Sequence, residues 1–231
     1  PSEADGREEA PTGNDDGFDP NAPPTPCNTL PAGRSGQDLG VRALQGNYPK
    51  VAVDGNQAVV ASGSGYVAFY VMDEATGLWS RSEVFGTMVN VGDIHSVAIS
   101  GNTAVVGAPE ASTNLSPSRL QTGAIYIYEK DETTNKWRQL RGAYIPEEYQ
   151  RGAKAGQFRD AGFGKSVDID GDLIVAGAPE ENSNEGSITV FRRDGSEWRE
   201  AARRRPDRLC PAEFYGYSVH VRGDTIAASA D

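Results

Sequence analysis

A short run of oxygen-bearing side chains between two apolar segments is the part of the sequence that most resembles a metal site. It contains Glu180, Glu181, Asn182, Asn184 and Glu185. Carboxylate and amide oxygens are the ligands that hard cations such as calcium prefer. A solvated surface loop would have the same composition, so the run predicts either a calcium site or a solvated loop, and the loop is the simpler interpretation.

A second candidate binding motif is the cell-adhesion tripeptide Arg222-Gly223-Asp224, which falls on a predicted hairpin turn where it would be exposed. Its Gly-Asp half is also part of a recurring turn, because Gly171-Asp172 occupies the same place in another copy of the pattern described below. Only Arg222 is independent of that pattern. Coincidence is therefore the preferred interpretation, with ligand binding as the alternative.

Residues that could catalyse a reaction do not form a recognisable constellation. The chain has two histidines, His95 and His220, and both fall in predicted strands. Gly164-Lys165-Ser166 resembles the end of a phosphate-binding loop, but Arg159 stands where the upstream glycine is required. The sequence also contains no Gly-x-Ser-x-Gly nucleophile elbow. We therefore expect binding rather than catalysis and predict that the chain is not an enzyme.

A degenerate unit that recurs along the chain must position these residues. Each copy opens with alternating apolar residues, which predict a half-buried strand. A glycine followed by Asn or Asp then predicts a tight hairpin. A wholly apolar strand, an aromatic strand and a strand with Trp complete the unit. The hairpin glycines are Gly55, Gly101, Gly171 and Gly223, and the tryptophans are Trp79, Trp137 and Trp198.

Four antiparallel strands that recur in this way are typical of a propeller blade. The sequence therefore predicts an all-β chain, a β-propeller of four-stranded antiparallel blades with about three and a half blades present. The predicted repeats span about residues 45–90, 91–150, 158–205 and 213–231. Because propellers close with about four to eight blades, we expect the chain to be part of a larger propeller.

Phe163-Gly164 and Gly177-Ala178-Pro179 resemble the FG-GAP repeat, which is the blade unit of integrin α-subunit propellers. Gly107-Ala108-Pro109 and Tyr215-Gly216 carry weaker forms of the same signature, and the resemblance covers about residues 45–231. It implies a β-propeller at the cell surface or outside the cell. It also implies a protein or glycan ligand bound at a rim of the propeller.

The same resemblance implies a calcium loop between the first two strands of a blade, at Asp168, Asp170 and Asp172. Calcium takes about six to eight oxygen ligands. Here Asp172 runs directly into the apolar strand that begins at Leu173, so the hairpin is too short to surround an ion without outside ligands. Calcium is the one cofactor that the sequence suggests, and none is certain.

Residues 1–44 are rich in Pro, Gly and Asp and predict a disordered acidic linker, because such a segment has little apolar surface to bury. Cys27 and Cys210 could form a disulfide if the protein is extracellular, and free thiols or cysteine partners outside this chain are equally open. A third feature is an arginine cluster after Trp198, comprising Arg199, Arg203, Arg204, Arg205 and Arg208. It predicts a solvated loop between blades, with an anionic glycan or protein contact as the alternative.

The net charge of −11 argues against nucleic acid as a partner and against an anionic membrane surface. No segment of this chain predicts direct insertion into a membrane. The function that the sequence favours is a non-enzymatic, extracellular or cell-surface propeller module for adhesion or for binding a protein or glycan. The alternative is the propeller domain of a larger secreted enzyme whose catalytic groups lie outside this chain.

Overall fold

The computed structural model describes residues 49–63, 65–86, 91–112, 121–140, 142–150, 158–206 and 213–230. All of them lie in the second of two compact units, Asp38–Asp231. The predicted linker at residues 1–44 and the two cysteines, Cys27 and Cys210, lie outside the described residues.

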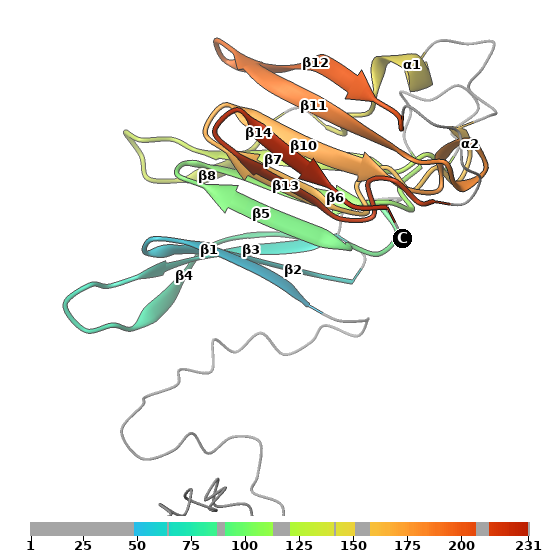
Figure 1. Ribbon diagram of the computed structural model, residues 1–231. Coiled ribbons are helices and arrows are strands. Elements are labelled where there is room, and N and C mark those ends of the chain that lie inside the picture. The colour runs from blue at the N-terminus through green and yellow to red at the C-terminus, as the bar shows by residue number, and fades with distance from the viewer. Residues whose placement is uncertain are drawn as a thin grey trace, which may run out of the picture. The chain divides into compact units, whose positions relative to one another are not determined.

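Three four-stranded antiparallel sheets and one two-stranded sheet make up this unit, and within each sheet the strands follow one another in chain order (Figure 1). We call them blades 1 to 4. Blade 1 comprises β1 (Lys50–Asp54), β2 (Gln57–Ser62), β3 (Tyr66–Met72) and β4 (Trp79–Phe85), and blade 2 comprises β5 (Ser96–Ser100), β6 (Thr103–Ala108), β7 (Ala124–Lys130) and β8 (Trp137–Gln139). Blade 3 comprises β9 (Val167–Asp170), β10 (Leu173–Ala178), β11 (Ser187–Asp194) and β12 (Glu197–Arg204), and blade 4 comprises β13 (Val219–Arg222) and β14 (Thr225–Ala228).

The predicted all-β, blade-like architecture is therefore confirmed. Two short helices, α1 (Glu147–Gln150) and α2 (Glu181–Asn184), are the helical elements of the described residues. No helix among those residues is long and apolar enough to cross a membrane.

The first hairpin of every blade is a two-residue turn that begins with glycine. The φ angles of Gly55, Gly101, Gly171 and Gly223 are all between +54° and +56°. Such a left-handed backbone strains any residue with a Cβ, whereas glycine adopts it freely. These turns fix the register of the first two strands, for example Asp170 opposite Leu173.

The blades stack through their first strands, with β1 beside β5, β5 beside β9, and β9 beside β13. Between blades 1 and 2 the filling is aromatic. Phe69 stacks on Trp137 with ring centroids 4.0 Å apart, and Phe85 and Tyr128 complete the group. The tryptophan that begins the fourth strand of blade 2 thus packs against the third strand of blade 1, which explains why this position takes a large aromatic residue.

The FG-GAP signature residues meet across the boundary between blades. The Ser96 hydroxyl donates a 2.9 Å hydrogen bond to the carbonyl oxygen of Gly164, and the Ser166 hydroxyl donates a 2.8 Å bond to that of Gly216. A Cβ on Gly107 would collide with the same Gly164 carbonyl, and a Cβ on Gly177 would collide with that of Gly216. The glycine of Gly-Ala-Pro therefore leaves room for the backbone of the following blade.

A second contact recurs at the hairpin end of each boundary. The last residue of the first strand accepts a hydrogen bond from the N–H of the next blade's hairpin glycine. Gly101 donates to Asp54 at 2.6 Å, Gly171 donates to the hydroxyl of Ser100 at 3.1 Å, and Gly223 donates to Asp170 at 2.6 Å. We call these three bonds the hairpin bonds.

Candidate functional site

A cavity of about 230 Å³ lies between blades 2 and 3, where the segments that precede the first strands meet those that follow the second strands. Both short helices lie at the same end of the sheets (Figure 1). The lining is mostly polar and carries charges of both signs. Its residues are His95, Pro109, Glu110, Gln121, Asp160, Lys165 and Glu180. We call this the rim cavity.

The repeat places equivalent residues of two blades around the rim cavity. Glu110 follows Gly107-Ala108-Pro109, and Glu180 follows the matching Gly-Ala-Pro of blade 3. Each glutamate packs against a glycine with positive φ. A Cβ on Gly92 would come within 3.0 Å of the Glu110 Oε2 atom, and a Cβ on Gly162 would collide with the Glu180 carboxylate. Both glycines lie against these glutamates and have φ angles of +66° and +68°, so a residue with a side chain would be strained at either position.

His95 and Lys165 supply the basic side chains of the rim cavity. Burial lowers the pKa of His95 below its ordinary value of 6.5, and the positive charge of Lys165 lowers it further, while Glu110 opposes the shift. The imidazole is therefore neutral at pH 7 and offers one donor and one acceptor. With the carboxylates, the ammonium and the Gln121 amide, the cavity presents groups suited to hydroxyl, amide or charged groups of a ligand.

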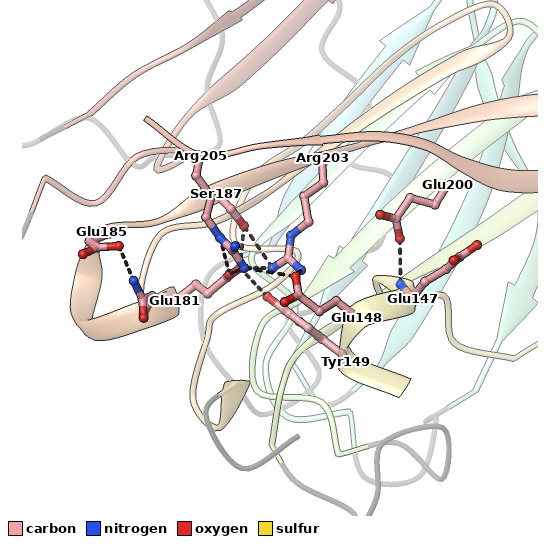
Figure 2. Close-up of polar contacts among 10 residues, drawn as sticks. Glu147, Glu148, Tyr149, Glu181, Glu185, Ser187, Glu200, Arg203 and Arg205 are labelled. Atoms are coloured by element: carbon pink, nitrogen blue, oxygen red, sulfur yellow. Dashed lines mark hydrogen bonds and ion pairs between the residues drawn. The ribbon is translucent and has the colours of Figure 1, made fainter. Parts of the chain in front are cut away.

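The predicted oxygen-rich run forms α2 and its surroundings, and its members have different roles. The Glu181 side chain is fully buried and accepts bonds from four residues (Figure 2). Arg205 Nη2 lies 2.7 Å from Oε1, whereas Oε2 accepts from Arg203, from the Ser187 hydroxyl at 2.5 Å and from the Tyr149 hydroxyl at 2.9 Å. We call this group, with Glu148, the Glu181 cluster.

Two arginines and two carboxylates thus occupy the Glu181 cluster, because Glu148 also lies 2.8 Å from Arg203 and 3.1 Å from Arg205. Arg203 additionally stacks over the Tyr149 ring, with 4.7 Å between its guanidinium carbon and the ring centroid. The cluster joins α1, α2 and β12. The N–H of Glu147, at the start of α1, donates a 2.6 Å bond to the Glu200 carboxylate of β12, which reinforces the same attachment (Figure 2).

Burial alone would raise the pKa of Glu181, but the charge of Arg203 and the bonds from Ser187, Arg205 and Tyr149 outweigh it. The net pKa of Glu181 is therefore lowered from 4.5. Burial and the neighbouring Glu181 charge together raise the pKa of Tyr149 well above 10. At neutral pH the cluster consists of ionised Glu181, two arginines and a neutral Tyr149, and its geometry is that of a structural attachment.

The remaining members of the run lie apart from this group. The Asn182 amide donates to the Glu185 carboxylate, and Asn182 and Asn184 both have positive φ. Glu180 lines the rim cavity. The structure therefore separates Glu180, Glu181 and Glu185 instead of directing their oxygens toward one point.

The three aspartates that the family resemblance suggested as calcium ligands are also separate. Asp168 accepts a 2.8 Å bond from the Val221 N–H and lies 2.6 Å from Nδ1 of His220. Asp170 makes the hairpin bond to Gly223, and Asp172 accepts a 3.0 Å bond from Arg193. Within the described residues, no three His, Cys, Asp or Glu side chains form a group that could hold a metal ion. Calcium binding at these positions stays a prediction.

The tripeptide Arg222-Gly223-Asp224 lies on the hairpin between β13 and β14, as predicted, and all three residues are exposed. The Gly223 N–H is bound to Asp170, so the turn is fixed to blade 3. The disulfide predicted between Cys27 and Cys210 lies outside the described residues.

Part of the arginine cluster is not the solvated loop that the sequence predicted, and Arg208 lies outside the described residues. Arg199, Arg203 and Arg204 belong to β12, and the Arg203 side chain is 10% exposed. Sequence reasoning also missed Tyr149 as a partner of Glu181. The only signal in the sequence was the group of arginines after Trp198, which would need acidic partners. It could not identify Glu181 or Tyr149, because these residues lie far from the arginines in the sequence.

The blade-like sheets, which contact one another through their first strands, define a β-propeller-like repeat module. The family model for the FG-GAP repeat matches residues 95–128, which comprise β5, β6 and most of β7 of blade 2. The resemblance is therefore confirmed, and the match is in the second repeat, whereas the third carries the clearest signature residues. No curated protein matches the sequence.

Solved structures with a similar fold include the crystal structure of the computationally designed Ika4 protein. Its TM-score is 0.50 at 14% sequence identity, and the alignment covers 85% of this chain and 93% of that one. At this identity the likeness concerns the fold alone.

Proposed function

We propose that this chain is a non-enzymatic, extracellular or cell-surface β-propeller module that binds a protein or glycan at the rim cavity. The observation that carries the proposal is that equivalent residues of two successive blades line this cavity. Glu110 and His95 come from blade 2, and Glu180 and Lys165 come from blade 3. The sheets fix the backbone from which these side chains project, so the ligand groups are held in place before binding.

The charges of the rim cavity indicate the chemistry of the ligand. Glu110 and Glu180 are exposed, and His95 and Lys165 are half-buried, so all four side chains are reachable from solvent. Neutral His95 accepts or donates a hydrogen bond with a hydroxyl group, the two carboxylates accept hydrogen bonds from hydroxyl groups, and Lys165 binds a carboxylate or a backbone carbonyl. A sugar or an exposed protein loop offers these groups close together.

The binding test uses the full chain, immobilised and probed with an array of glycans and with a panel of extracellular matrix proteins. We expect binding to one class, and we expect Lys165→Ala and Glu180→Gln each to weaken it about tenfold, which corresponds to loss of a hydrogen bond to a charged group. Lys136→Ala is the matched control, because Lys136 is 72% exposed in the turn before β8, away from the rim.

Failure of both ligand classes to bind would contradict the proposal. Binding that is insensitive to Lys165→Ala and Glu180→Gln would place the ligand elsewhere and would also contradict it. The localisation is tested by treating intact source cells with protease, since a surface protein is cleaved and an intracellular one is protected.

A further inference from the structure

The outer side of the boundary between blades 2 and 3 carries two adjoining hollows, of about 490 Å³ and 260 Å³. They lie along the start of β12, and most of the other lining residues come from β8, from the segment after it and from α1. Glu197 and Trp198 line both hollows, and we call the combined hollow the outer groove. Both flanking blades have all four of their strands, and among the described residues none lines both the outer groove and the rim cavity.

The indole of Trp198 is the wall that the two hollows share. This residue is 1% exposed, and its Nε1–H group is buried without an acceptor among the residues that the structure describes. Arg193 lies over the ring, with its guanidinium carbon 4.6 Å from the ring centroid, and contributes only donors. A buried N–H that lacks an acceptor is unfavourable, so an acceptor oxygen that enters the outer groove would be stabilised there.

Three glutamates line the larger hollow from two elements. Glu147 belongs to α1, and Glu197 and Glu200 belong to β12. The Glu147 N–H donates a 2.6 Å hydrogen bond to the Glu200 carboxylate, which holds the two elements together at this point (Figure 2). Each carboxylate offers about four acceptor positions, so this bond leaves most of the acceptor capacity of the hollow for a donor from outside.

The two arginines of the outer groove do not neutralise these glutamates, because each has a carboxylate partner outside the groove. Arg138 lies 3.6 Å from the Glu129 carboxylate, and Arg199 lies 3.3 Å from that of Asp194. Arg199 also lies 3.4 Å from Glu197, and all three side chains of this group are about two thirds exposed. The groove is therefore acidic, and the net charge of −11 adds long-range attraction for a basic partner.

We propose that the outer groove binds an arginine-bearing segment of another polypeptide, with the guanidinium among the three glutamates and a neighbouring backbone carbonyl as acceptor for the Trp198 indole N–H. A guanidinium has five donors and no acceptor, and it matches carboxylates in geometry as well as charge. The aliphatic part of the arginine would pack on Ile145 and Phe191, which also line the larger hollow. This site does not depend on the function proposed for the rim cavity.

The probe is an end-blocked peptide, Gly-Ser-Arg-Ser-Gly, titrated into the full chain at low salt. Its matched control carries citrulline in place of arginine, which keeps the shape and removes the charge. The readout is the indole N–H resonance of Trp198 in the ¹⁵N-labelled protein, which contains three tryptophans. Trp198→Phe assigns this resonance by its loss, and Trp79→Phe and Trp137→Phe assign the other two if the first variant does not fold.

The Trp198 resonance should shift saturably with the arginine peptide, and the citrulline peptide should bind at least about tenfold more weakly, as expected for loss of hydrogen bonds to charged groups. Glu197→Gln should weaken binding of the arginine peptide about threefold, as for an exposed ion pair. Glu74→Gln is the matched control, since Glu74 is an exposed residue in the turn between β3 and β4, and it should leave the affinity unchanged.

A Trp198 resonance that does not respond to the arginine peptide would overturn the proposal. Equal affinity for the citrulline peptide, or unchanged affinity in Glu197→Gln, would overturn it as well. Spermidine tests the charge alone, because it is a cation without a carbonyl group. If spermidine shifted the Trp198 resonance as far as the peptide does, a cation alone would suffice, and the assignment to a polypeptide segment would be wrong.

Discussion

Asp170 accepts a 2.6 Å hydrogen bond from the backbone N–H of Gly223, across the boundary between blades 3 and 4. Asp54 stands in the same relation to Gly101. Both aspartates lie next to hairpin turns, and the family resemblance suggests Asp170 as a calcium ligand. In the structure, their oxygens bond to backbone N–H groups of the following blade.

Replacing Asp170 with alanine should destabilise the protein by about 1 kcal/mol, because the Gly223 N–H then has only water as an acceptor. Chemical denaturation measures the change. Glu74→Ala is the control, since Glu74 is an exposed turn residue, and it should change stability little. Equal stability of the Asp170 and Glu74 variants would show that the hairpin bond contributes nothing measurable.

Gly177→Ala should cost about 3 kcal/mol, because its Cβ would collide with the carbonyl of Gly216 and force two backbones apart. Gly142→Ala is the matched control, as its Cβ would meet no atom within 4 Å. The melting temperature should fall for the first variant and stay near that of the wild type for the second. A Gly177 variant as stable as the control would contradict the close approach between blades.

Glu181→Ala should destabilise the protein by about 3 to 5 kcal/mol, because it leaves two arginines without their buried partner. Urea denaturation is the measurement. Glu185→Ala serves as control, since the Glu185 carboxylate accepts its hydrogen bond from the exposed Asn182 of the same turn, and the substitution keeps the backbone bonds of Glu185. If both variants lost the same stability, the Glu181 cluster would not be the attachment that we infer.

The pKa of Glu181 predicts how stability depends on pH. The folded protein binds the proton of this carboxyl less well than the unfolded chain does, because the folded pKa is lowered from 4.5. The stability that Glu181 contributes is therefore complete above pH 4.5 and is lost as the pH falls through the folded pKa. Relative to Glu181→Gln, the wild type should lose stability below pH 4.5, and parallel pH profiles would contradict the assignment.

The order of the strands could be predicted from the sequence because each blade repeats local signals. Gly171 requires a left-handed turn, and Trp137 requires a large aromatic contact, whatever the length of the loops. The Glu181 cluster could not be predicted, because Arg203 and Tyr149 belong to different elements and no periodic spacing relates them. The role of Asp170 could not be decided from the sequence either, since a carboxylate next to a turn can serve equally well as a metal ligand or as an acceptor for a backbone N–H.

The hairpin bonds also bear on how such a chain could grow in evolution. The donor is a backbone N–H of the turn, which every blade has, and the acceptor is a single side chain at the end of the first strand. A blade copied by gene duplication would therefore arrive with its own donor for the preceding neighbour and its own acceptor for the following one. Arg222 holds the acceptor position in blade 4, and a guanidinium cannot accept a hydrogen bond. A blade duplicated from blade 4 would thus need one substitution, Arg222→Asp or Arg222→Ser, before it could make the same bond to the blade after it.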